Sequence, residues 1–313
     1  MARFLVTGGA GFIGSHLVDA LSKKGHDVRI LDDFSSGSME NLEDAQERYA
    51  NAIEIIKGSI TEPDLVDSAV KGIDAIFHEA ALVSVSESMK NPKKTRAINV
   101  EGTRNVLESA KENKVKNVIL ASSAAVYGDN PPPLIETMPV KPLSPYASSK
   151  CELENLARCY WQDFGIRTIS LRYFNVYGPR QDTKSEYSGV IARFMDCLKQ
   201  GKQLTIYGDG KQTRDFIYVE DVIRANLLAL DSDIPGGRTY NIATGKGITL
   251  LELLKIMQKL YPTKIEPIHK PARAGDIRHS YANIKKARSE LGFEPGVRLE
   301  SGLKELGKWM GFE

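Results

Sequence analysis

Thr7-Gly8-Gly9-Ala10-Gly11-Phe12-Ile13-Gly14 is a GxxGxxG stretch that follows a short apolar run and opens a helical pattern ending near Gly25. Glycines allow a tight turn and let a pyrophosphate approach the backbone closely. The free N–H groups and positive dipole end of the following helix stabilise its charge. Gly-rich turns before helices are common, so the pattern alone is weak evidence. Its place between two strands and before a helix predicts a dinucleotide site.

Short β-branched runs alternate with longer amphipathic segments along the first half of the chain. Six runs are predicted as strands, over residues 3–7, 27–32, 53–57, 75–78, 117–122 and 167–172. Val118-Ile119-Leu120 is continuously apolar, as expected of a strand that helices cover on both faces. The sequence therefore predicts an α/β fold with a doubly wound parallel (Rossmann) sheet.

The rhythm changes after residue 172. Turn-rich stretches at residues 177–180 and 207–210 flank one helical pattern at 189–200, which predicts a smaller α/β lobe. Residues 215–230 again resemble a strand that leads into a helix. We therefore expect the chain to return to the first lobe there and to finish in the second.

Composition excludes several classes of function. The chain has 313 residues, and its 42 basic and 40 acidic residues form no long single-sign block, so neither a nucleic-acid nor a membrane partner is expected. Three cysteines without CxxC and five histidines without ligand spacing argue against a metal or disulfide framework. The first apolar run is short, and none approaches a membrane span, so we expect no signal peptide and a cytoplasmic protein.

The second predicted strand ends in Asp32-Asp33, where a carboxylate can accept hydrogen bonds from the adenosine ribose hydroxyls. Such a carboxylate would repel a 2′-phosphate. Residues 34–38 contain no Arg or Lys to neutralise that phosphate, which favours NAD over NADP. Asp32 is the stronger candidate, because a role in a surface turn explains Asp33 equally well.

Tyr146 and Lys150 place a phenol and an ammonium four residues apart, on one face of a helix if that helix starts near Pro145. Other pairs share this spacing, but here Ser123 ends a preceding predicted strand and so lies at the same sheet edge. Ionising a tyrosine near pH 7 requires about 4 kcal/mol. A cation ~4 Å away supplies on the order of 4 kcal/mol. We predict Ser123, Tyr146 and Lys150 as the catalytic set; the alternative is a packed tyrosine and a solvated lysine.

Four further stretches complete the pattern formed by the glycine loop and by Ser123, Tyr146 and Lys150. They are Asn99-Val100-Glu101-Gly102-Thr103, residues 122–128, Arg172-Tyr173-Phe174-Asn175 and residues 213–216. With them the chain resembles, over nearly its whole length, the extended short-chain dehydrogenase/reductase family, specifically its NDP-sugar 4-epimerases. The resemblance implies NAD as cofactor, a UDP-sugar as substrate and a homodimer that pairs helices around residues 95–113 and 148–164. The apolar positions of those helices could equally pack only within one monomer.

The resemblance also implies two lobes and two sets of binding residues. Residues 1–174 and 215–240 would bind NAD, and residues 175–214 and 241–313 the nucleotide sugar. The cofactor set is Gly8, Gly11, Phe12, Ile13, Asp32, Asp33, Phe34, Ser35, Gly37, Ser59, Ile60, Ala80, Ala81, Asn99, Ser122, Tyr146, Lys150, Tyr173 and Phe174. The substrate set is Ser84, Ser123, Asn175, Gln181, Val190, Thr205, Tyr207, Arg214, Arg273, Asp276 and Ser280.

The chemistry of the residues agrees with some of the roles that the resemblance implies. Arg214 and Arg273 would give a diphosphate two bidentate donors, although each could be an ordinary surface arginine. Two positions depart from the family pattern: Ser59 replaces the usual Asp near the adenine, and Glu79 stands where a Gln or an apolar residue is expected. Both departures concern the surroundings of the cofactor.

The residues after Ser123 bear on the type of reaction. By resemblance, sugar 4,6-dehydratases carry an Asp-Glu pair there and uronate decarboxylases a Glu, whereas this chain has Ala124-Ala125. Alanine can neither donate nor accept a proton, which favours an isomerase, a 4-epimerase of UDP-hexoses that works through a transient 4-keto sugar. The alternatives are a uronate 4-epimerase, a decarboxylase, a 4,6-dehydratase or a non-catalytic NAD-binding sensor.

Ser280 bears on the sugar. Epimerases that this chain resembles carry a gatekeeper at this position, where a bulky Tyr restricts the pocket to glucose and galactose. A small serine implies that UDP-N-acetylglucosamine and UDP-N-acetylgalactosamine are accepted together with UDP-glucose and UDP-galactose. Alternatively, Ser280 is an incidental rim residue and Tyr281 fills the space.

Overall fold

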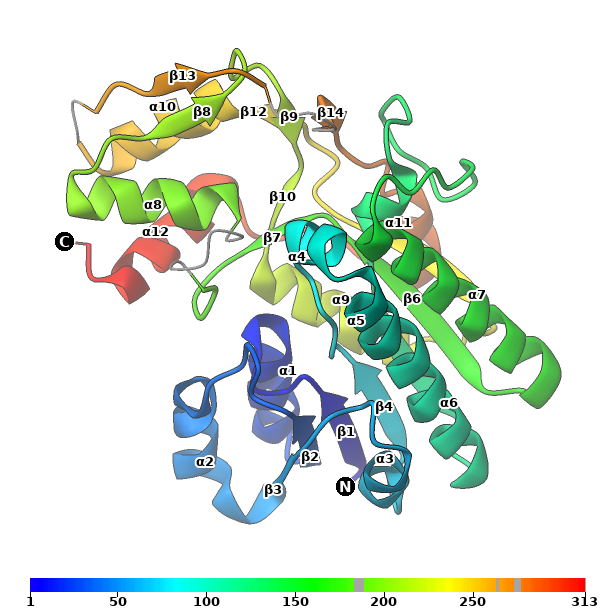
Figure 1. Ribbon diagram of the computed structural model, residues 1–313. Coiled ribbons are helices and arrows are strands. Elements are labelled where there is room, and N and C mark those ends of the chain that lie inside the picture. Colours follow the sequence, from blue (N-terminus) through cyan, green and yellow to red (C-terminus); the bar gives the residue numbers. More distant parts are fainter. Residues whose placement is uncertain (183–188, 263–264, 273–276, 313) are drawn as a thin grey trace.

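The computed structural model describes residues 1–182, 189–262, 265–272 and 277–312. Its centre is a parallel sheet of seven strands in the order β11-β6-β5-β4-β1-β2-β3 (Figure 1). The strands are β1 (Arg3–Thr7), β2 (Asp27–Asp32), β3 (Ile53–Lys57), β4 (Ala75–His78), β5 (Asn117–Ser123), β6 (Arg167–Tyr173) and β11 (Arg238–Ile242). The predicted fold class is confirmed, with all six predicted strands in place. The seventh, β11, was missed because Arg238, Thr239 and Asn241 interrupt its apolar pattern.

Helices cover both faces of this sheet. They are α1 (Phe12–Lys23), α2 (Glu43–Tyr49), α3 (Pro63–Val70), α4 (Val85–Lys90), α5 (Pro92–Arg96), α6 (Thr103–Glu112), α7 (Pro145–Phe164), α9 (Val219–Asp231) and α11 (Lys285–Leu291). A six-residue π-helical segment (Ala97–Gly102) joins α5 to α6. Successive residues of one strand enter opposite cores: Ile119 packs with the side of α1 and α9, whereas Val118 and Leu120 pack with α3, α6 and α7. The continuous apolar run therefore reflects burial on both faces.

The strand order reverses between β1 and β4. The chain leaves β1 toward β2 and β3 on one side, whereas β4, β5, β6 and β11 extend the sheet on the other. In open α/β sheets ligands bind in the crevice at the carboxyl ends of the strands beside such a switch point. The glycine-rich stretch follows β1, and Glu79-Ala80 follows β4, so both lie at this crevice.

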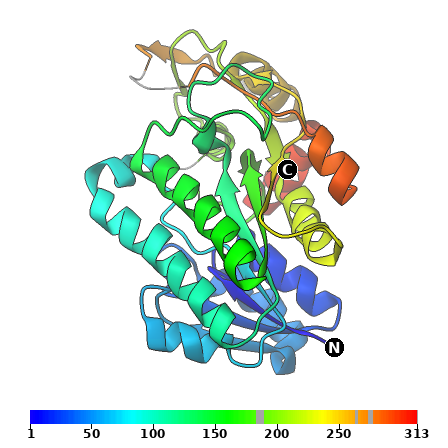
Figure 2. The same cartoon turned by 90° about the vertical axis from the view of Figure 1, so that its right-hand side faces the viewer.

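The smaller lobe lies beyond the carboxyl edge of the sheet (Figures 1 and 2). It contains β7 (Asn175–Tyr177), α8 (Val190–Gln200), β8 (Thr205–Tyr207), β9 (Thr213–Arg214), β12 (Ile248–Thr249), α10 (Leu250–Leu260), β13 (Ile268–Lys270), β14 (His279–Ser280) and α12 (Leu299–Met310). Strand β10 (Phe216–Tyr218) pairs with β7 and continues into α9, which contacts β5 and β6 of the central sheet. One apolar cluster joins residues of both lobes, including Leu17 of α1 and Phe194 of α8.

A buried ion pair ties α7 to β6. Arg172 donates to both carboxylate oxygens of Glu154, from Nε at 2.8 Å and from Nη2 at 2.7 Å. Both side chains are only 5% exposed. The Ser122 hydroxyl donates to the same carboxylate at 2.5 Å. This arrangement fixes the helix that carries Tyr146 against the strands whose ends form the crevice.

Replacing Glu154 with Gln leaves the Arg172 charge buried without its partner, so we expect Glu154→Gln to lower the free energy of unfolding by about 3 kcal/mol. The matched control is Glu152→Gln, two residues away, which removes an exposed ion pair with Arg96. We expect the control to cost under about 1 kcal/mol. Urea denaturation measures both values, and equal losses would contradict the argument.

Candidate functional site

The glycine loop has the shape that a pyrophosphate requires. Gly8 has φ +71°, and an added Cβ there would lie 2.7 Å from the backbone nitrogen of Ala80, so only glycine fits. Helix α1 begins at Phe12 with Gly11 as its N-cap, and no side chain that the structure describes caps it. Its first turn holds no acidic residue. These uncapped N–H groups fit a dinucleotide phosphate.

Asp32 lies beside this loop at the end of β2. Its carboxylate accepts the backbone N–H groups of Ala10 at 2.9 Å and Phe34 at 2.8 Å. Burial raises the pKa of Asp32 above its ordinary value, against the effect of these two hydrogen bonds. Asp33 is exposed and accepts the N–H of Ser35 at 2.9 Å, as a residue of a surface turn does. The two aspartates thus have different surroundings, and those of Asp32 favour it as the predicted ribose ligand.

The predicted adenine end is formed by the loops after β2 and β3. Gly37 packs so tightly on Ala10 that an added Cβ would lie 2.8 Å from the Ala10 carbonyl carbon. Ser59, one of the two departures, bonds to the Thr61 hydroxyl at 2.9 Å, while Ile60 is buried beside it. The loop after β2, which carries Gly37, therefore borders the glycine loop. The loop after β3, which carries Ser59 and Ile60, follows the strand next to β2.

A buried network that the sequence did not reveal supports the ends of β1 and β4. The His78 ring bonds to the Thr7 hydroxyl at 2.8 Å and to the Thr103 hydroxyl at 2.9 Å. Thr103 donates to the carbonyl of Asn99, so it accepts from His78 Nε2, and Nδ1 then accepts from Thr7. Burial lowers the pKa of His78 to about 3, which keeps the ring neutral. Its only sequence signal is a histidine at a strand end.

Asn99 links two predicted cofactor segments. Its amide oxygen accepts the N–H of Leu82 at 2.7 Å, and its amide nitrogen donates to the Leu82 carbonyl and to the Ser149 hydroxyl, both at 3.0 Å. The loop after Ala80-Ala81 is thereby held against α7. Ser84 lies further along and caps α4 by accepting the N–H of Glu87.

The three predicted catalytic residues meet at the carboxyl edge of the sheet. Ser123 ends β5, and Tyr146 lies in the first turn of α7, which begins at Pro145 as expected. The Ser123 side chain lies close enough to the Tyr146 phenol to lower the pKa of that phenol. Lys150 Nζ lies 5.9 Å from the centre of the Tyr146 ring and donates to the Ala121 carbonyl at 2.7 Å. All three therefore share one site.

The electrostatics differ from the simple expectation of one cation beside one phenol. Burial raises the pKa of Tyr146 above its ordinary value, and the hydrogen bond with Ser123 lowers it by less. Burial also lowers the pKa of Lys150 to about 8, so its ammonium is itself easily deprotonated. In this arrangement burial disfavours the charged form of both groups, and Tyr146 carries its proton at neutral pH.

The other residues predicted at the end of β5 and β6 are held by protein partners. The Ser122 hydroxyl donates to Glu154. A contact between Ser122 and the cofactor would therefore involve the Ser122 backbone. Phe174 is buried against Tyr127, with ring centres 6.4 Å apart. Tyr173 donates to Glu79 at 2.8 Å.

Part of the predicted substrate set is organised around the buried Asp215. The backbone carbonyl of Asp215 accepts the Asn175 N–H at 3.1 Å, and its carboxylate accepts the N–H groups of Thr244, Gly245 and Ala282. Sequence reasoning missed Asp215, although it lies inside one of the stretches that carry the resemblance. It joins β7 to the segment that follows β14.

Arg214 and Ser280 are register partners in the β9–β14 pair. The Tyr281 ring lies against Gly247, where an added Cβ would come within 2.8 Å of the ring Cδ1. Thr205 and Tyr207 are the first and last residues of β8, and Val190 begins α8. Gln181 donates to the Val176 carbonyl at 3.1 Å. Two predicted residues, Arg273 and Asp276, lie outside the described residues.

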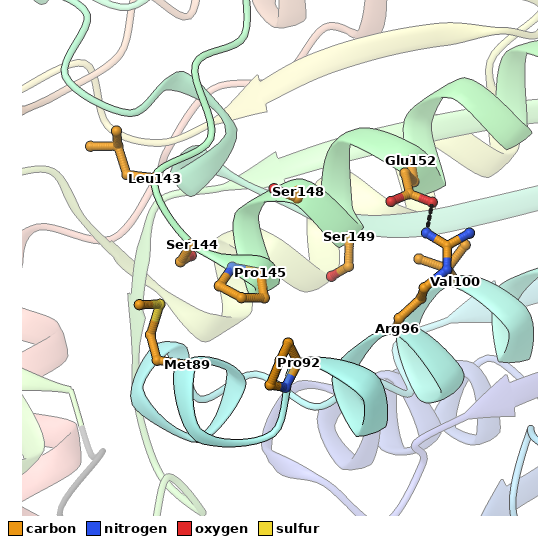
Figure 3. A pocket seen from close by; sticks show the side chains of 10 residues that line it. All are labelled: Met89, Pro92, Arg96, Val100, Leu143, Ser144, Pro145, Ser148, Ser149 and Glu152. Atoms are coloured by element: carbon orange, nitrogen blue, oxygen red, sulfur yellow. Dashed lines mark hydrogen bonds and ion pairs between the residues drawn. The ribbon is translucent and has the colours of Figure 1, made fainter.

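A separate hollow of about 500 Å³ lies between α4–α5 and the start of α7 (Figure 3). Met89, Pro92 and Arg96 face the start of α7 across it, and an ion pair joins Arg96 to Glu152. None of the predicted site residues lines this hollow in the part of the chain that the structure describes. It is therefore distinct from the crevice that holds Tyr146.

The fold and site together define a Rossmann-type, nucleotide-cofactor-dependent enzyme of the short-chain dehydrogenase kind. A sequence profile of the NAD dependent epimerase/dehydratase family matches residues 4–243. The chain belongs to this family, and the predicted cofactor, NAD, is confirmed. It is thus an enzyme of the NDP-sugar epimerase/dehydratase family.

Three known proteins illustrate what this chain is similar to. The chain is 41% identical, over 98% of its length and 97% of the relative, to a putative UDP-glucose 4-epimerase of Methanocaldococcus jannaschii. It is also 35% identical, over 98% and 97%, to a UDP-N-acetyl-alpha-D-glucosaminuronate decarboxylase of Bacillus cytotoxicus. Its structure is similar to that of a UDP-N-acetylglucosamine 4-epimerase from Methanobrevibacter ruminantium in complex with UDP-N-acetylmuramic acid, with TM-score 0.94, 39% identity, and coverage of 99% and 98%.

Two features are absent from the described residues. These residues contain no helix that is both long and apolar enough to cross a membrane. They also contain no cluster of three or more His, Cys, Asp or Glu side chains suited to a metal ion.

The two aspartates at the end of β2 give a direct test of the ribose contact. We expect Asp32→Asn to weaken NAD binding by roughly tenfold or more, since a charged hydrogen bond is lost, while Asp33→Asn leaves it nearly unchanged. Binding is measured by calorimetry on protein stripped of nucleotide. Wild type purified without added nucleotide should release NAD(H) on denaturation, and a predominance of NADP(H) would contradict the assignment of Asp32.

Proposed function

We propose that this enzyme is an NAD-dependent isomerase that interconverts 4-epimers of UDP-hexoses through a transient 4-keto sugar. The observation that carries the proposal is the Ser123–Tyr146–Lys150 site at the switch point, followed by Ala124-Ala125. In this proposal residues 1–174 and 215–240 bind the cofactor, and residues 175–214 and 241–313 bind the nucleotide sugar. Strand β11 runs across the boundary at residue 240.

The absence of side-chain acid/base groups at Ala124-Ala125 supports epimerisation over dehydration or decarboxylation. These residues form the short turn after β5, in which Ala125 donates its N–H to the Ser123 hydroxyl at 3.1 Å. The next ionisable side chain, Tyr127, is fully buried and donates to Asn241. Burial raises the pKa of Tyr127 to about 12, so it is a poor proton donor or acceptor at neutral pH.

The chain's own residues then have simple roles. Once the Tyr146 phenol has lost its own proton, it takes the proton of the sugar 4-hydroxyl and later returns it, and the Ser123 hydroxyl beside the phenol orients that 4-hydroxyl. Lys150 stabilises the negative charge that develops on Tyr146. Bound NAD supplies the hydride acceptor and donor at C4. Because the hexose must present both faces, binding energy belongs on the nucleotide diphosphate, for which Arg214 and Arg273 are the proposed donors.

Tyr146→Phe deletes the proton acceptor while it keeps the ring, so we expect kcat to fall about 10²–10⁴-fold with a small change in UDP-sugar affinity. Steady-state kinetics and calorimetric binding separate the two effects. Near-normal turnover in this variant would show that another group takes the proton.

For the sugar, we propose that the acetylated pair, UDP-N-acetylglucosamine and UDP-N-acetylgalactosamine, and the unsubstituted pair, UDP-glucose and UDP-galactose, are both substrates. The small Ser280 side chain supports this, because it is half-buried in β14 beside Arg214. The packing of the Tyr281 ring against Gly247 supports it further, since that ring is already engaged elsewhere. A relative solved with an N-acetylated UDP-sugar is consistent with the same reading.

Ser280→Tyr should fill the proposed sugar pocket and selectively reduce activity on the acetylated pair. Forcing an N-acetyl group into a filled pocket costs about 1–3 kcal/mol, which corresponds to roughly 5- to 150-fold in kcat/KM. The measurement is separation of 4-epimers after incubation of wild type and variant with all four UDP-sugars.

UDP-glucuronate added to the same panel tests the alternative reactions. Release of carbon dioxide or formation of a 4-keto-6-deoxy sugar would contradict the epimerase proposal. Equal activity of wild type and Ser280→Tyr on both pairs would contradict the proposed role of Ser280 in sugar selection. The epimerase proposal would stand, because the epimerase reaction would still be present.

The proposal includes a cytoplasmic homodimer, with α6 and α7 as the paired helices, as expected from the sequence. Exposed apolar groups beside the start of α7 support an interface there: Leu143, just before the helix, is 54% exposed, and Met89 of α4 is 62% exposed. Charged side chains also lie in this region, among them the ion pair between Arg96 of α5 and Glu152 of α7. A monomeric mass in sedimentation equilibrium would overturn the dimer.

A further inference from the structure

Glu79 is a carboxylate that the proposed reaction does not use, although it lies at the centre of the crevice. It directly follows β4, and its N–H donates to the Thr7 carbonyl at 3.1 Å. His78 pairs with Leu120 in the parallel β4–β5 ladder, so Glu79 lies beside Ala121. Lys150 Nζ donates to the carbonyl of Ala121. Glu79 therefore lies about one strand spacing, ~5 Å, from the backbone group that anchors the lysine.

A directed chain of hydrogen bonds fixes the Glu79 side chain. The Asn226 amide donates to the Tyr173 hydroxyl at 2.8 Å, and that hydroxyl donates to Glu79 Oε1 at 2.8 Å. Because the Tyr173 proton is directed at Glu79, this oxygen is an acceptor. Asn226 is itself held by the Val222 carbonyl of α9 at 2.9 Å. The carboxyl group is thus aimed by β6 and α9 rather than left free on a loop.

The charges around Glu79 come from several elements. Helix α7 contributes the Lys150 cation and the Tyr146 phenol, and β6 contributes Tyr173. His78 on β4 is kept neutral by burial. Glu154 also acts on Lys150, but its carboxylate is paired with Arg172. Among the described residues, Glu79 is the carboxylate near Lys150 for which the structure gives no cationic hydrogen-bond partner.

Burial raises the pKa of Glu79 to about 7, which the Tyr173 hydrogen bond and the Lys150 charge partly oppose. Glu79 in turn opposes ionisation of Tyr146. Its effect on the Tyr146 pKa is smaller than that of burial and that of the Ser123 hydroxyl. It therefore changes charge in the same pH range in which the site must work, and it does so next to the group that would take the substrate proton.

We propose that Glu79 is a positioning residue that acts through Tyr146 and Lys150: its carboxylate favours the charged form of Lys150, opposes ionisation of Tyr146 and so sets the pH at which Tyr146 becomes a base. This inference rests on the proposed function for the role of Tyr146, but the coupling itself is a property of the protein. As pH rises, Glu79 ionises and makes the phenolate harder to form but more basic once formed. Loss of the Tyr146 proton then spreads over a wider pH range than a single independent group would show.

The test uses Glu79→Gln, which removes the charge but keeps an oxygen to accept the Tyr173 proton. Tyrosinate absorbance of the NAD-loaded protein is followed against pH in wild type and variant. Each trace is corrected by the same protein carrying Tyr146→Phe, so that only Tyr146 contributes. We expect the Tyr146 transition in Glu79→Gln to move to lower pH by roughly one pH unit and to become steeper.

Two more variants separate charge from structure. Glu79→Ala removes both charge and hydrogen bond and should shift the transition as Glu79→Gln does. Glu87→Gln, a carboxylate change in α4 that lies in the same β4–α4 segment and bonds to Asn91, should leave the transition at its wild-type pH. A shift in Glu79→Ala alone would mean that the hydrogen bond matters and would overturn the proposal, as would coincident curves for wild type and Glu79→Gln.

The acid limb of kcat/KM on whichever UDP-sugar is turned over should move in the same direction in Glu79→Gln. If no UDP-sugar is converted, the proposed function fails while the absorbance titration still decides the coupling. If turnover is present and its acid limb is the same in wild type and Glu79→Gln, the proposed function stands and the role of Glu79 is wrong.

Discussion

The contact between the glycine loop and the end of β4 is the constraint on which the rest of the site depends. Gly8 adopts a positive φ and packs on the Ala80 backbone so closely that a Cβ has no room. This approach is possible only where the strand order reverses, because there β1 and β4 are neighbours and their following loops diverge. The same contact brings Asp32, the start of α1 and the end of β5 to one crevice.

Buried polar networks hold this crevice in shape. His78, with hydroxyl partners on both ring nitrogens, joins β1 and β4 to α6. The Arg172–Glu154 pair joins β6 to α7. Both networks are buried, and apart from Arg172 Nη1 their polar side-chain atoms are hydrogen-bonded, so displacement of a member would leave further polar groups without a partner. Rigidity at the site therefore comes from satisfied polar groups between elements, in addition to the two apolar cores.

Burial dominates the electrostatics of the predicted catalytic residues. It raises the pKa of Tyr146 and lowers that of Lys150, so the low dielectric works against the ion pair that a spacing argument suggests. Glu79 adds a carboxylate to the same small volume. In such a cluster the protonation of each group depends on the others, and the site behaves as a coupled set.

The sequence by itself determined the parallel sheet and the glycine loop, and it predicted Asp32 as a ribose ligand and Ser123, Tyr146 and Lys150 as the catalytic set. Each of these depends on local patterns: residue spacing, apolar runs and the conformational freedom of glycine. Strand β11 was missed because its alternating polar residues are stabilised by distant partners such as Glu136, which accepts the Asn241 N–H. Only the tertiary structure decided the partners of Asp215, the neutral state of His78 and the environment of Glu79. Those properties arise from burial and from contacts between residues far apart in the chain, which no local pattern encodes.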